Sequence, residues 1–196
     1  MISDSVSAII LAGGRSRRMN REKPLLLVNG QPLIETLIAQ IRPCFDQIMI
    51  SAVNKEKFAF LNLPVVEDEA PGQGPLLAIL SALRASTCQT NFVMACDIPV
   101  IHIPFLKKIL SLAPRYEIVV PRYRNGKFFE PLFAAYDRSV IPAIEKQTSS
   151  GDFKISSLFQ TCRTKFVAMD GQKWFCNLNT LEEYHDYLRK EKRHAP

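Results

Sequence analysis

The chain has 196 residues, and its 25 basic and 19 acidic side chains give a formal net charge of +6. A chain of this length suits one domain with a substantial core, so we expect a single domain over residues 1–196. No apolar run approaches the ~18 residues that a membrane span requires. The first residues also lack the basic region of a signal peptide. These features exclude a membrane-spanning protein, and they favour a cytoplasmic protein with anionic partners.

The cysteines and the basic residues narrow the class of partner further. The five cysteines are widely spaced, and no two of them stand in a C-x-x-C pattern. This spacing indicates neither a disulfide framework nor a zinc site, and it suits a reducing compartment. No nucleic-acid signature with interleaved aromatic residues occurs. The densest basic run, residues 189–193, closes the last predicted helix, where cations complement the helix dipole. We therefore expect small polyphosphates, rather than nucleic acid or a membrane, as partners.

Strand-like and helix-like segments alternate along the first half of the chain. Short apolar runs predict strands at residues 7–11, 25–28, 47–53, 65–66, 91–95 and 117–120. Helical spacing of apolar residues, with Pro75 in a first turn, predicts helices at residues 33–41, 56–61, 75–85 and 104–112. This alternation predicts βαβ units, a mainly parallel central sheet and helices on both of its faces. The fold class is therefore α/β, with three layers.

The second half of the chain is less regular. Residues 123–127 form a charged turn, and residues 131–136 have the composition of a strand. Residues 138–147 are expected to be helical. The closing helix covers residues 180–192, with Thr180 as its N-cap and two glutamates in its first turn.

The end of the first predicted strand has the composition of a phosphate-binding loop. Gly13-Gly14 follows the apolar run and opens into a cluster of cations from Arg15 to Lys23. Glycine lets backbone N–H groups approach phosphate oxygens, and arginine and lysine supply charge-assisted hydrogen bonds. The same residues also suit a solvated strand-to-helix turn. Neither the P-loop pattern nor the G-x-G-x-x-G fingerprint is present here.

A carboxylate ends another buried strand. Asp97 follows the apolar strand at residues 91–95, and Pro99 stands two residues further on. A carboxylate in this place is a good Mg²⁺ ligand, and it also suits the cap of the next helix. In an open parallel sheet, ligands bind beyond the carboxyl ends of the strands. The loops at residues 12–23, 67–74 and 96–99 should meet there, which favours phosphate binding at the first loop and a metal at Asp97.

At this point the sequence resembles a known family. The run Leu11-Ala12-Gly13-Gly14-Arg15-Ser16-Arg17-Arg18-Met19, with Lys23 behind it, is similar to the signature of nucleotidyltransferases that activate small phosphates with an NTP. Further matches narrow the resemblance to molybdenum cofactor guanylyltransferases: Gly74-Pro75-Leu76, Cys96-Asp97-Ile98-Pro99, Pro131-Leu132-Phe133-Ala134 and Asn177-Leu178-Asn179-Thr180. These matches follow the family order over nearly the whole chain. The resemblance implies the Rossmann-like nucleotidyltransferase fold.

The resemblance also implies roles for individual residues. The nucleotide-binding positions are Leu11, Ala12, Gly13, Gly14, Arg15, Lys23, Ser51, Asp68 and Asp97. The catalytic residues among them are Arg15, Lys23 and Asp97. Asp97 also takes the metal, Mg²⁺. Asn177 and Asn179 face the pterin or the product.

The activity that the resemblance implies is transfer of GMP from GTP to the terminal phosphate of molybdopterin, with release of pyrophosphate. Molybdenum-cofactor biosynthesis proteins and acceptor molybdoenzymes are further implied partners. Two alternatives remain open from the sequence: a related nucleotidyltransferase that uses CTP or another phosphorylated acceptor, and a non-catalytic nucleotide-binding scaffold.

Overall fold

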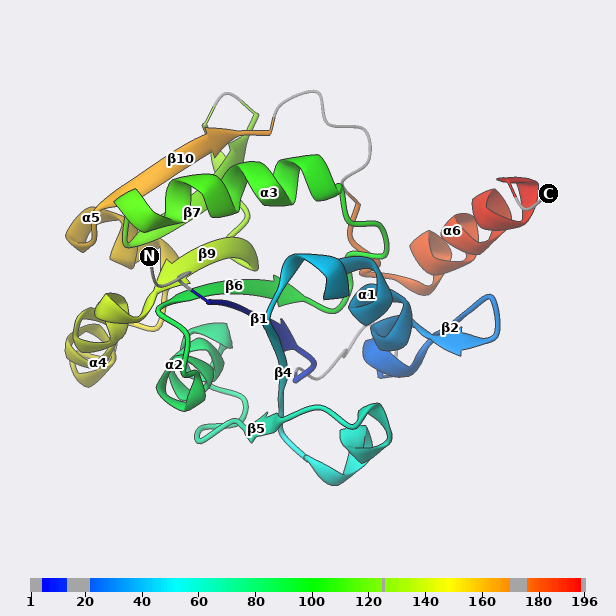
Figure 1. The fold of residues 1–196 in the computed structure, drawn as a ribbon, viewed down its shortest axis with the longest axis horizontal. Helices are drawn as coiled ribbons and strands as arrows, with labels where there is room; N and C mark the ends of the chain where they lie inside the picture. Colours follow the sequence, from blue (N-terminus) through cyan, green and yellow to red (C-terminus); the bar gives the residue numbers. More distant parts are fainter. Residues whose placement is uncertain (1–4, 14–21, 125, 170–175, 195–196) are drawn as a thin grey trace.

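The computed structural model describes residues 5–13, 22–124, 126–169 and 176–194, with side chains placed up to residue 190. Its centre is one eight-stranded sheet in the order β10-β7-β9-β6-β1-β4-β5, with β8 paired to β7 (Figure 1). A separate two-stranded hairpin is formed by β2 and β3. The strands are β1 Val6–Leu11, β2 Leu27–Val28, β3 Gln31–Pro32, β4 Gln47–Ala52, β5 Val65–Glu67, β6 Thr90–Ala95, β7 Ile118–Tyr123, β8 Phe128–Phe129, β9 Phe133–Asp137 and β10 Thr164–Ala168.

Helices cover both faces of the sheet and make the three layers that the sequence predicts. They are α1 Leu33–Ile41, α2 Pro75–Ala85, α3 Ile103–Leu112, α4 Ile141–Ser149, α5 Ile155–Thr161 and α6 Leu181–His194. One core cluster joins α1 and α3 to one face of the sheet, and a second joins α2, α4 and α5 to the other. In Figure 1, α6 extends from the body toward the C-terminus. The predicted α/β class with a mainly parallel sheet is confirmed.

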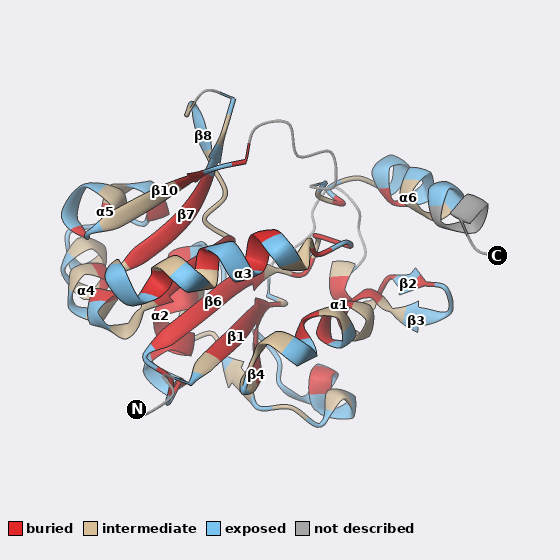
Figure 2. Cartoon of the chain, turned by 45° about the horizontal axis from the view of Figure 1, so that its top comes forward, coloured by how far each residue is buried: buried red, intermediate tan, exposed pale blue. Residues whose placement is uncertain are grey.

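The alternation of side chains along β1 explains why its sequence is apolar throughout. Ala8 and Ile10 belong to the core under α1 and α3, whereas Ile9 and Leu11 belong to the core under α2. Successive residues of a strand point to opposite faces, so a strand covered on both faces needs apolar residues at every position. Figure 2 shows β1 and the neighbouring β6 buried along most of their length.

The sequence locates most elements of the first half within one or two residues. The turn between β2 and β3 carries Asn29 and Gly30 at φ 51° and 84°, and such positive φ values at both positions suit a tight hairpin turn. The segment at residues 56–61 is helical as expected, although it is a 3-10 helix.

The second half departs from the sequence expectations in its details. The strand β9 runs antiparallel between β6 and β7, so it interrupts the parallel order. The segments β8, α5 and β10 are not predicted by the sequence, because each is short; β8 and α5 also follow stretches whose glycines and charges are typical of turns. The expected helix at residues 138–147 begins as a 3-10 turn and continues as α4. Within the described residues, no helix has the length and apolarity needed to cross a membrane.

Candidate active site

The carboxyl ends of four neighbouring parallel strands lie at one edge of the sheet. Register pairs Leu11 with both Ser51 and Ala95, so β1 ends beside β4 and β6. The strand β5 ends next to β4. The chain segments after these strands include the three loops that the sequence expected to meet. Parallel pairing therefore brings together chemistry that is spread over residues 11–97 of the sequence.

The most informative contact at this edge joins Lys23 to Asp97. The Lys23 Nζ lies 2.9 Å from the Asp97 Oδ2, and the two side chains are only 16% and 17% exposed. Lys23 begins a 3-10 helix whose second residue is the buried Pro24, which helps to fix its position. Asp97 follows β6 in a turn and is not the N-cap of α3, because His102 occupies that position. The structure thus faces the loop lysine with the strand-end carboxylate across 74 residues of sequence.

A C-terminal segment is fastened over the same pair. The Lys23 Nζ also donates to the Asn179 Oδ1 at 3.0 Å, and the Leu178 amide donates to the Asp97 carbonyl at 2.8 Å. The Leu178 side chain is buried in the core, which anchors the segment. Asn179 immediately precedes the cap of α6, where Glu183 accepts from two backbone amides and Thr180 accepts from the Glu183 amide. The N-cap role expected of Thr180 is confirmed by that contact.

A second carboxyl group, that of Glu130, lies beside Asp97, and it is not among the site residues predicted from the sequence. Burial and the negative charge of Asp97 raise the pKa of Glu130 to about 7. A hydrogen bond with Asn177 has a smaller effect in the opposite direction. Glu130 precedes β9, and β9 is antiparallel to β6. The residues before β9 therefore reach the same edge as the residues after β6. The neighbouring Pro131–Ala134 motif is the sequence feature that could have pointed to Glu130. It does so only if the direction of the strand is known, and the composition does not reveal that direction.

Oxygen atoms that suit a hard cation gather around this pair of carboxyl groups. Besides Asp97 and Glu130, the buried Asn177 Oδ1 has no hydrogen-bond partner among the described residues. Across that same part of the chain, no group of three or more His, Cys, Asp or Glu side chains forms a metal cluster. A site with so few protein carboxylates suits Mg²⁺, which takes one or two of them and completes its shell with water and substrate phosphates.

The other predicted nucleotide residues lie toward β4 and β5. The Ala12 amide donates to the Ser51 carbonyl at 2.8 Å, and Ser51 itself is buried. The Asp68 amide donates to the Ala52 carbonyl, and the Asp68 Oδ1 accepts from the Ala70 amide at 3.0 Å. Three strand spacings separate the end of β5 from the end of β6, which is about 14 Å at ~4.8 Å each. The structure therefore does not bring Asp68 to the Lys23–Asp97 pair.

Gly13 is the first residue of the Gly13-Gly14 pair that the sequence predicts to bind phosphate, and it follows Ala12 after the end of β1. A Cβ at Gly13 would meet Val53 at 3.7 Å, which is ordinary van der Waals contact, and its φ is not in the left-handed region. The protein's own packing thus does not require glycine at this position. If glycine is required at this position, the reason is a ligand that approaches the backbone closely. Gly14 and Arg15 lie outside the described residues.

Comparison with known proteins gives the class of this protein as a nucleotidyltransferase. A family model described as a MobA-like NTP transferase domain matches residues 8–165. A probable molybdenum cofactor guanylyltransferase of Carboxydothermus hydrogenoformans is 32% identical, over 94% of this chain and 96% of that protein. The chain belongs to the MobA-like NTP transferase family, so the resemblance seen in the sequence is confirmed.

Solved structures share the fold. The molybdopterin-guanine dinucleotide biosynthesis protein A of Archaeoglobus fulgidus superposes with a TM-score of 0.80 at 21% identity, covering 95% of this chain and 99% of that chain. A Mycobacterium tuberculosis protein in complex with manganese superposes with a TM-score of 0.68 at 19% identity, covering 94% of this chain and 98% of that chain. These likenesses, at such low identity, show the shared architecture.

Proposed function

We propose that the protein transfers GMP from GTP to the terminal phosphate of molybdopterin and releases pyrophosphate. The observation that supports this most is the 2.9 Å contact between Lys23 and Asp97 at the carboxyl edge of the sheet. The printed name of the Carboxydothermus hydrogenoformans relative, which aligns over 94% of this chain, supports the choice of substrates. The product is the guanine dinucleotide form of the cofactor.

The chain's own residues supply the electrostatics of this transfer. Phosphoryl chemistry depends on positioning and charge neutralisation more than on covalent catalysis. The Lys23 ammonium, held between the Asp97 and Asn179 oxygens, neutralises charge on the α-phosphate and on the leaving pyrophosphate. Arg15 holds the β- and γ-phosphates. The attacking phosphate of the acceptor is already ionised, so the reaction needs no general base.

Asp97 holds Mg²⁺ in this proposal, and the surrounding oxygen atoms fit that ion. The Asp97 carboxylate, the neighbouring Glu130 carboxyl and the unpaired Asn177 Oδ1 are hard oxygen donors of the kind that Mg²⁺ prefers. When bound, the ion neutralises phosphate oxygens and orients the triphosphate. The manganese complex of the Mycobacterium tuberculosis protein is in keeping with a divalent cation on this fold.

The nucleoside lies on the side of the site away from Asp97. The backbone of Leu11, Ala12 and Gly13 contacts the guanine and begins the phosphate loop, which Gly14 continues. Ser51 and Asp68 contact the nucleoside at the ends of β4 and β5. The ~14 Å between the ends of β5 and β6 suits a ligand with its base at one end and its triphosphate at the other.

Asn177 and Asn179 face the acceptor or the product. The setting of the reaction is the cytoplasm. Its further partners are the proteins that make the molybdenum cofactor and the molybdoenzymes that receive the product.

Pyrophosphate release is the experiment that tests this function. The purified protein is incubated with Mg²⁺, molybdopterin and each of the four NTPs in turn, and pyrophosphate is measured by a coupled assay. We expect release with GTP that depends on both molybdopterin and Mg²⁺. A thermal-shift series with the same NTPs reports binding alone, because a ligand of the folded state raises its stability. Preference for CTP in both assays overturns the guanylyl assignment, and binding without release indicates a scaffold.

A further inference from the structure

The cation that contacts Asp97 in this structure is an ammonium group of the chain itself. The Lys23 Nζ lies 2.9 Å from the Asp97 Oδ2. In the proposed function the same carboxylate binds a divalent cation, and the same ammonium binds phosphate oxygens. One contact therefore joins two charged groups whose roles require other partners, and each group neutralises the other here.

The backbone fixes both members of this ion pair. Lys23 begins a 3-10 helix whose second residue is the buried Pro24. The Asp97 carbonyl accepts from the Leu178 amide at 2.8 Å, and the Leu178 side chain is only 2% exposed. The lysine ammonium, in contrast, is a point charge on a flexible four-carbon stem. A change of partner is therefore expected at the ammonium, without movement of either backbone segment.

The ammonium makes the Asp97 carboxylate a poor site for a second cation. The two side chains are 16% and 17% exposed, so water screens their charges incompletely. A divalent cation at the other carboxylate oxygen would lie within a few ångströms of the ammonium, where like charges repel strongly. The Asn179 Oδ1 accepts from the same ammonium at 3.0 Å and so helps to hold it in this place. By the same argument, the carboxylate competes with phosphate oxygens for Lys23.

We propose that Lys23 and Asp97 form a charge-exchange pair, through which a divalent cation and a triphosphate bind together. The inference deepens the proposed function and rests on its assignment of Asp97 to the metal and of Lys23 to the phosphates. When both ligands bind, one ion pair is replaced by two, carboxylate with cation and ammonium with phosphate. Either ligand alone breaks the pair and leaves one partly buried charge without its partner, which is costly. Each ligand by itself therefore binds weakly.

Binding of a divalent cation alone tests the first half of the exchange. The probe is Mn²⁺ without nucleotide, and the electron paramagnetic resonance signal of the free ion is followed as the complete chain is added. We expect Lys23→Met, which keeps the length of the side chain and removes its charge, to bind Mn²⁺ at least about tenfold more tightly than the parent. Asp97→Asn should abolish this binding.

A parent that binds Mn²⁺ as tightly as Lys23→Met contradicts the inference, because ammonium and cation would then share the carboxylate. A Lys23→Met variant that binds no Mn²⁺ contradicts it equally. Should Lys23→Met fail to fold, which circular dichroism and thermal melts reveal, Lys23→Gln takes its place in the same titration.

The chain offers a matched lysine as the control. Lys57 forms an ion pair with Glu22, the residue before Lys23, but the side chains of this pair are 47% and 51% exposed. Removing a charge from so open a pair should change the Mn²⁺ affinity by no more than about twofold, because water and salt screen exposed charges. If Lys57→Met tightens Mn²⁺ binding as much as Lys23→Met does, the effect belongs to overall charge and the inference is wrong.

Binding of a triphosphate alone tests the second half. The probe is inorganic triphosphate, titrated calorimetrically in EDTA, so that neither a divalent cation nor the choice of base enters. We expect Asp97→Asn to bind it at least about fivefold more tightly than the parent, because an amide oxygen holds the ammonium less strongly than a carboxylate does. With Mg²⁺ present the sign reverses, and the same variant binds triphosphate more weakly than the parent. A merely structural role of Asp97 predicts weaker binding under both conditions, and that result overturns the inference.

These outcomes are distinguishable from the outcome for the proposed function, because neither titration uses GTP or the acceptor. If Lys23→Met tightens Mn²⁺ binding and the Asp97→Asn effect reverses sign, but GTP yields no pyrophosphate, the charge exchange stands and the guanylyl transfer fails. If the protein forms the dinucleotide product while its Mn²⁺ affinity does not respond to Lys23→Met, the function stands and the exchange fails.

Discussion

The two sides of the central sheet contrast in regularity and in the chemistry that they carry. On one side, β6, β1, β4 and β5 are all parallel, and their carboxyl ends carry the predicted nucleotide residues. On the other side, the antiparallel β9 separates β6 from β7 and brings Glu130 to the same edge. On the parallel side, every strand ends at the same edge, where ligands bind in open parallel sheets, so the place of the site could be predicted from the sequence. The other side reverses a strand, and its contribution became visible only in the structure.

Lys23→Ala should have the largest effect of the changes that test this contrast. Removing the ammonium takes away charge neutralisation at the α-phosphate and also leaves the Asp97 carboxylate, only 17% exposed, without its cation. We expect turnover to fall at least about 100-fold, the scale of one lost electrostatic group in an active site. Steady-state pyrophosphate release measures it, with Lys107→Ala, at an exposed lysine of α3, as the control for loss of a positive charge. A rate near that of the parent would remove Lys23 from the chemistry.

Glu130→Gln tests the antiparallel side through stability. The pKa of Glu130 is raised to about 7, so the folded protein holds a proton there that the unfolded chain loses near its ordinary pKa of 4.5. Where the folded state binds more protons, stability falls as pH rises, here between about pH 4.5 and pH 7. The neutral glutamine removes this loss.

We therefore expect the free energy of unfolding of Glu130→Gln to exceed that of the parent by roughly 1–3 kcal/mol at pH 8 and by little at pH 4.5, from ~1.4 kcal/mol per unit of pKa shift. Urea unfolding at the two pH values measures this difference. Equal differences at both values would contradict a buried, charge-strained carboxyl group. Glu117→Gln controls for a general effect of lost charge. Glu117 is also partly buried, but it accepts a hydrogen bond from the Arg163 amide before the start of β7, at the edge of the sheet opposite to Glu130.

Gly13→Ala tests the parallel side by separating binding from folding. The added methyl group meets only ordinary contacts, so the free energy of unfolding should change by no more than ~0.5 kcal/mol. GTP affinity should fall about tenfold, because a ligand that approaches the backbone at Gly13 meets the new Cβ. Isothermal titration with GTP measures the affinity.

Gly74→Ala is the contrasting variant at the same edge. Gly74 has φ +104°, so alanine there is strained, and stability itself should fall by about 1 kcal/mol or more. If Gly13→Ala instead destabilises the fold as much as Gly74→Ala does, the glycine serves packing and not the ligand.

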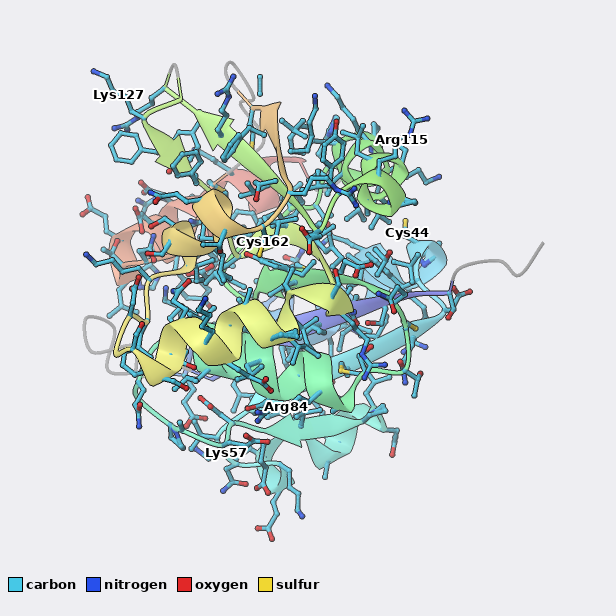
Figure 3. The ribbon with its side chains drawn as sticks, turned by 90° about the vertical axis from the view of Figure 1, so that its left-hand side faces the viewer. Cys44, Lys57, Arg84, Arg115, Lys127 and Cys162 are labelled. Atoms are coloured by element: carbon cyan, nitrogen blue, oxygen red, sulfur yellow. The ribbon has the colours of Figure 1, made fainter. Side chains whose placement is uncertain are left out.

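Arg84→Ala should have the smallest effect. Arg84, in the last turn of α2, forms ion pairs with Glu69 and Glu145, and its side chain is 43% exposed (Figure 3). Exposed pairs are typically worth about 0.2–1 kcal/mol each, and salt screens them. A small loss of stability, reduced at 1 M salt, and unchanged turnover are expected from urea unfolding and the pyrophosphate assay. A large loss of turnover would extend the site to a surface that this account leaves out.

The sequence was sufficient for the features that depend on local pattern. The apolar runs located β1, β4 and β6, and the rule for parallel sheets placed Asp97 and the Lys23 loop at one edge. Helix α6 could be placed from Thr180 and the glutamates that follow it.

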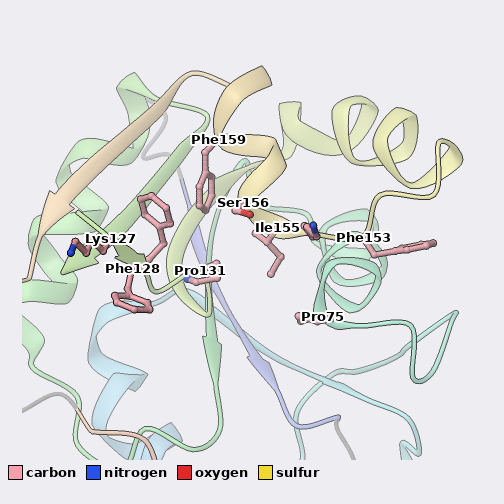
Figure 4. Close-up of a pocket in the computed structure, with 10 residues that line it drawn as sticks. Pro75, Lys127, Phe128, Pro131, Phe153, Ile155, Ser156 and Phe159 are labelled. Atoms are coloured by element: carbon pink, nitrogen blue, oxygen red, sulfur yellow. The ribbon is translucent and has the colours of Figure 1, made fainter. Parts of the chain in front are cut away.

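The rest depended on non-local pairing. Residues 131–136 are predicted to be a strand, and β9 lies there, but no feature of these residues specifies that β9 pairs with β6 in the antiparallel sense. A pocket lined by Pro75, Phe128 and Ile155, among others, takes its walls from three segments that only packing brings together (Figure 4). The contact from Asn179 to Lys23 spans 156 residues of sequence. Long-range register of this kind is set by the whole core and not by the residues that make the contact.

In the proposed mechanism, nucleotide transfer depends on the negative charge that Asp97 carries. Asp97→Asn tests it most directly, since asparagine keeps the size of the side chain and an oxygen that can accept from Lys23. The measurement is single-turnover formation of the guanine dinucleotide product from GTP and molybdopterin with saturating Mg²⁺. We predict a rate at least about 100-fold below that of the parent. A variant that forms product at the parental rate would contradict the account.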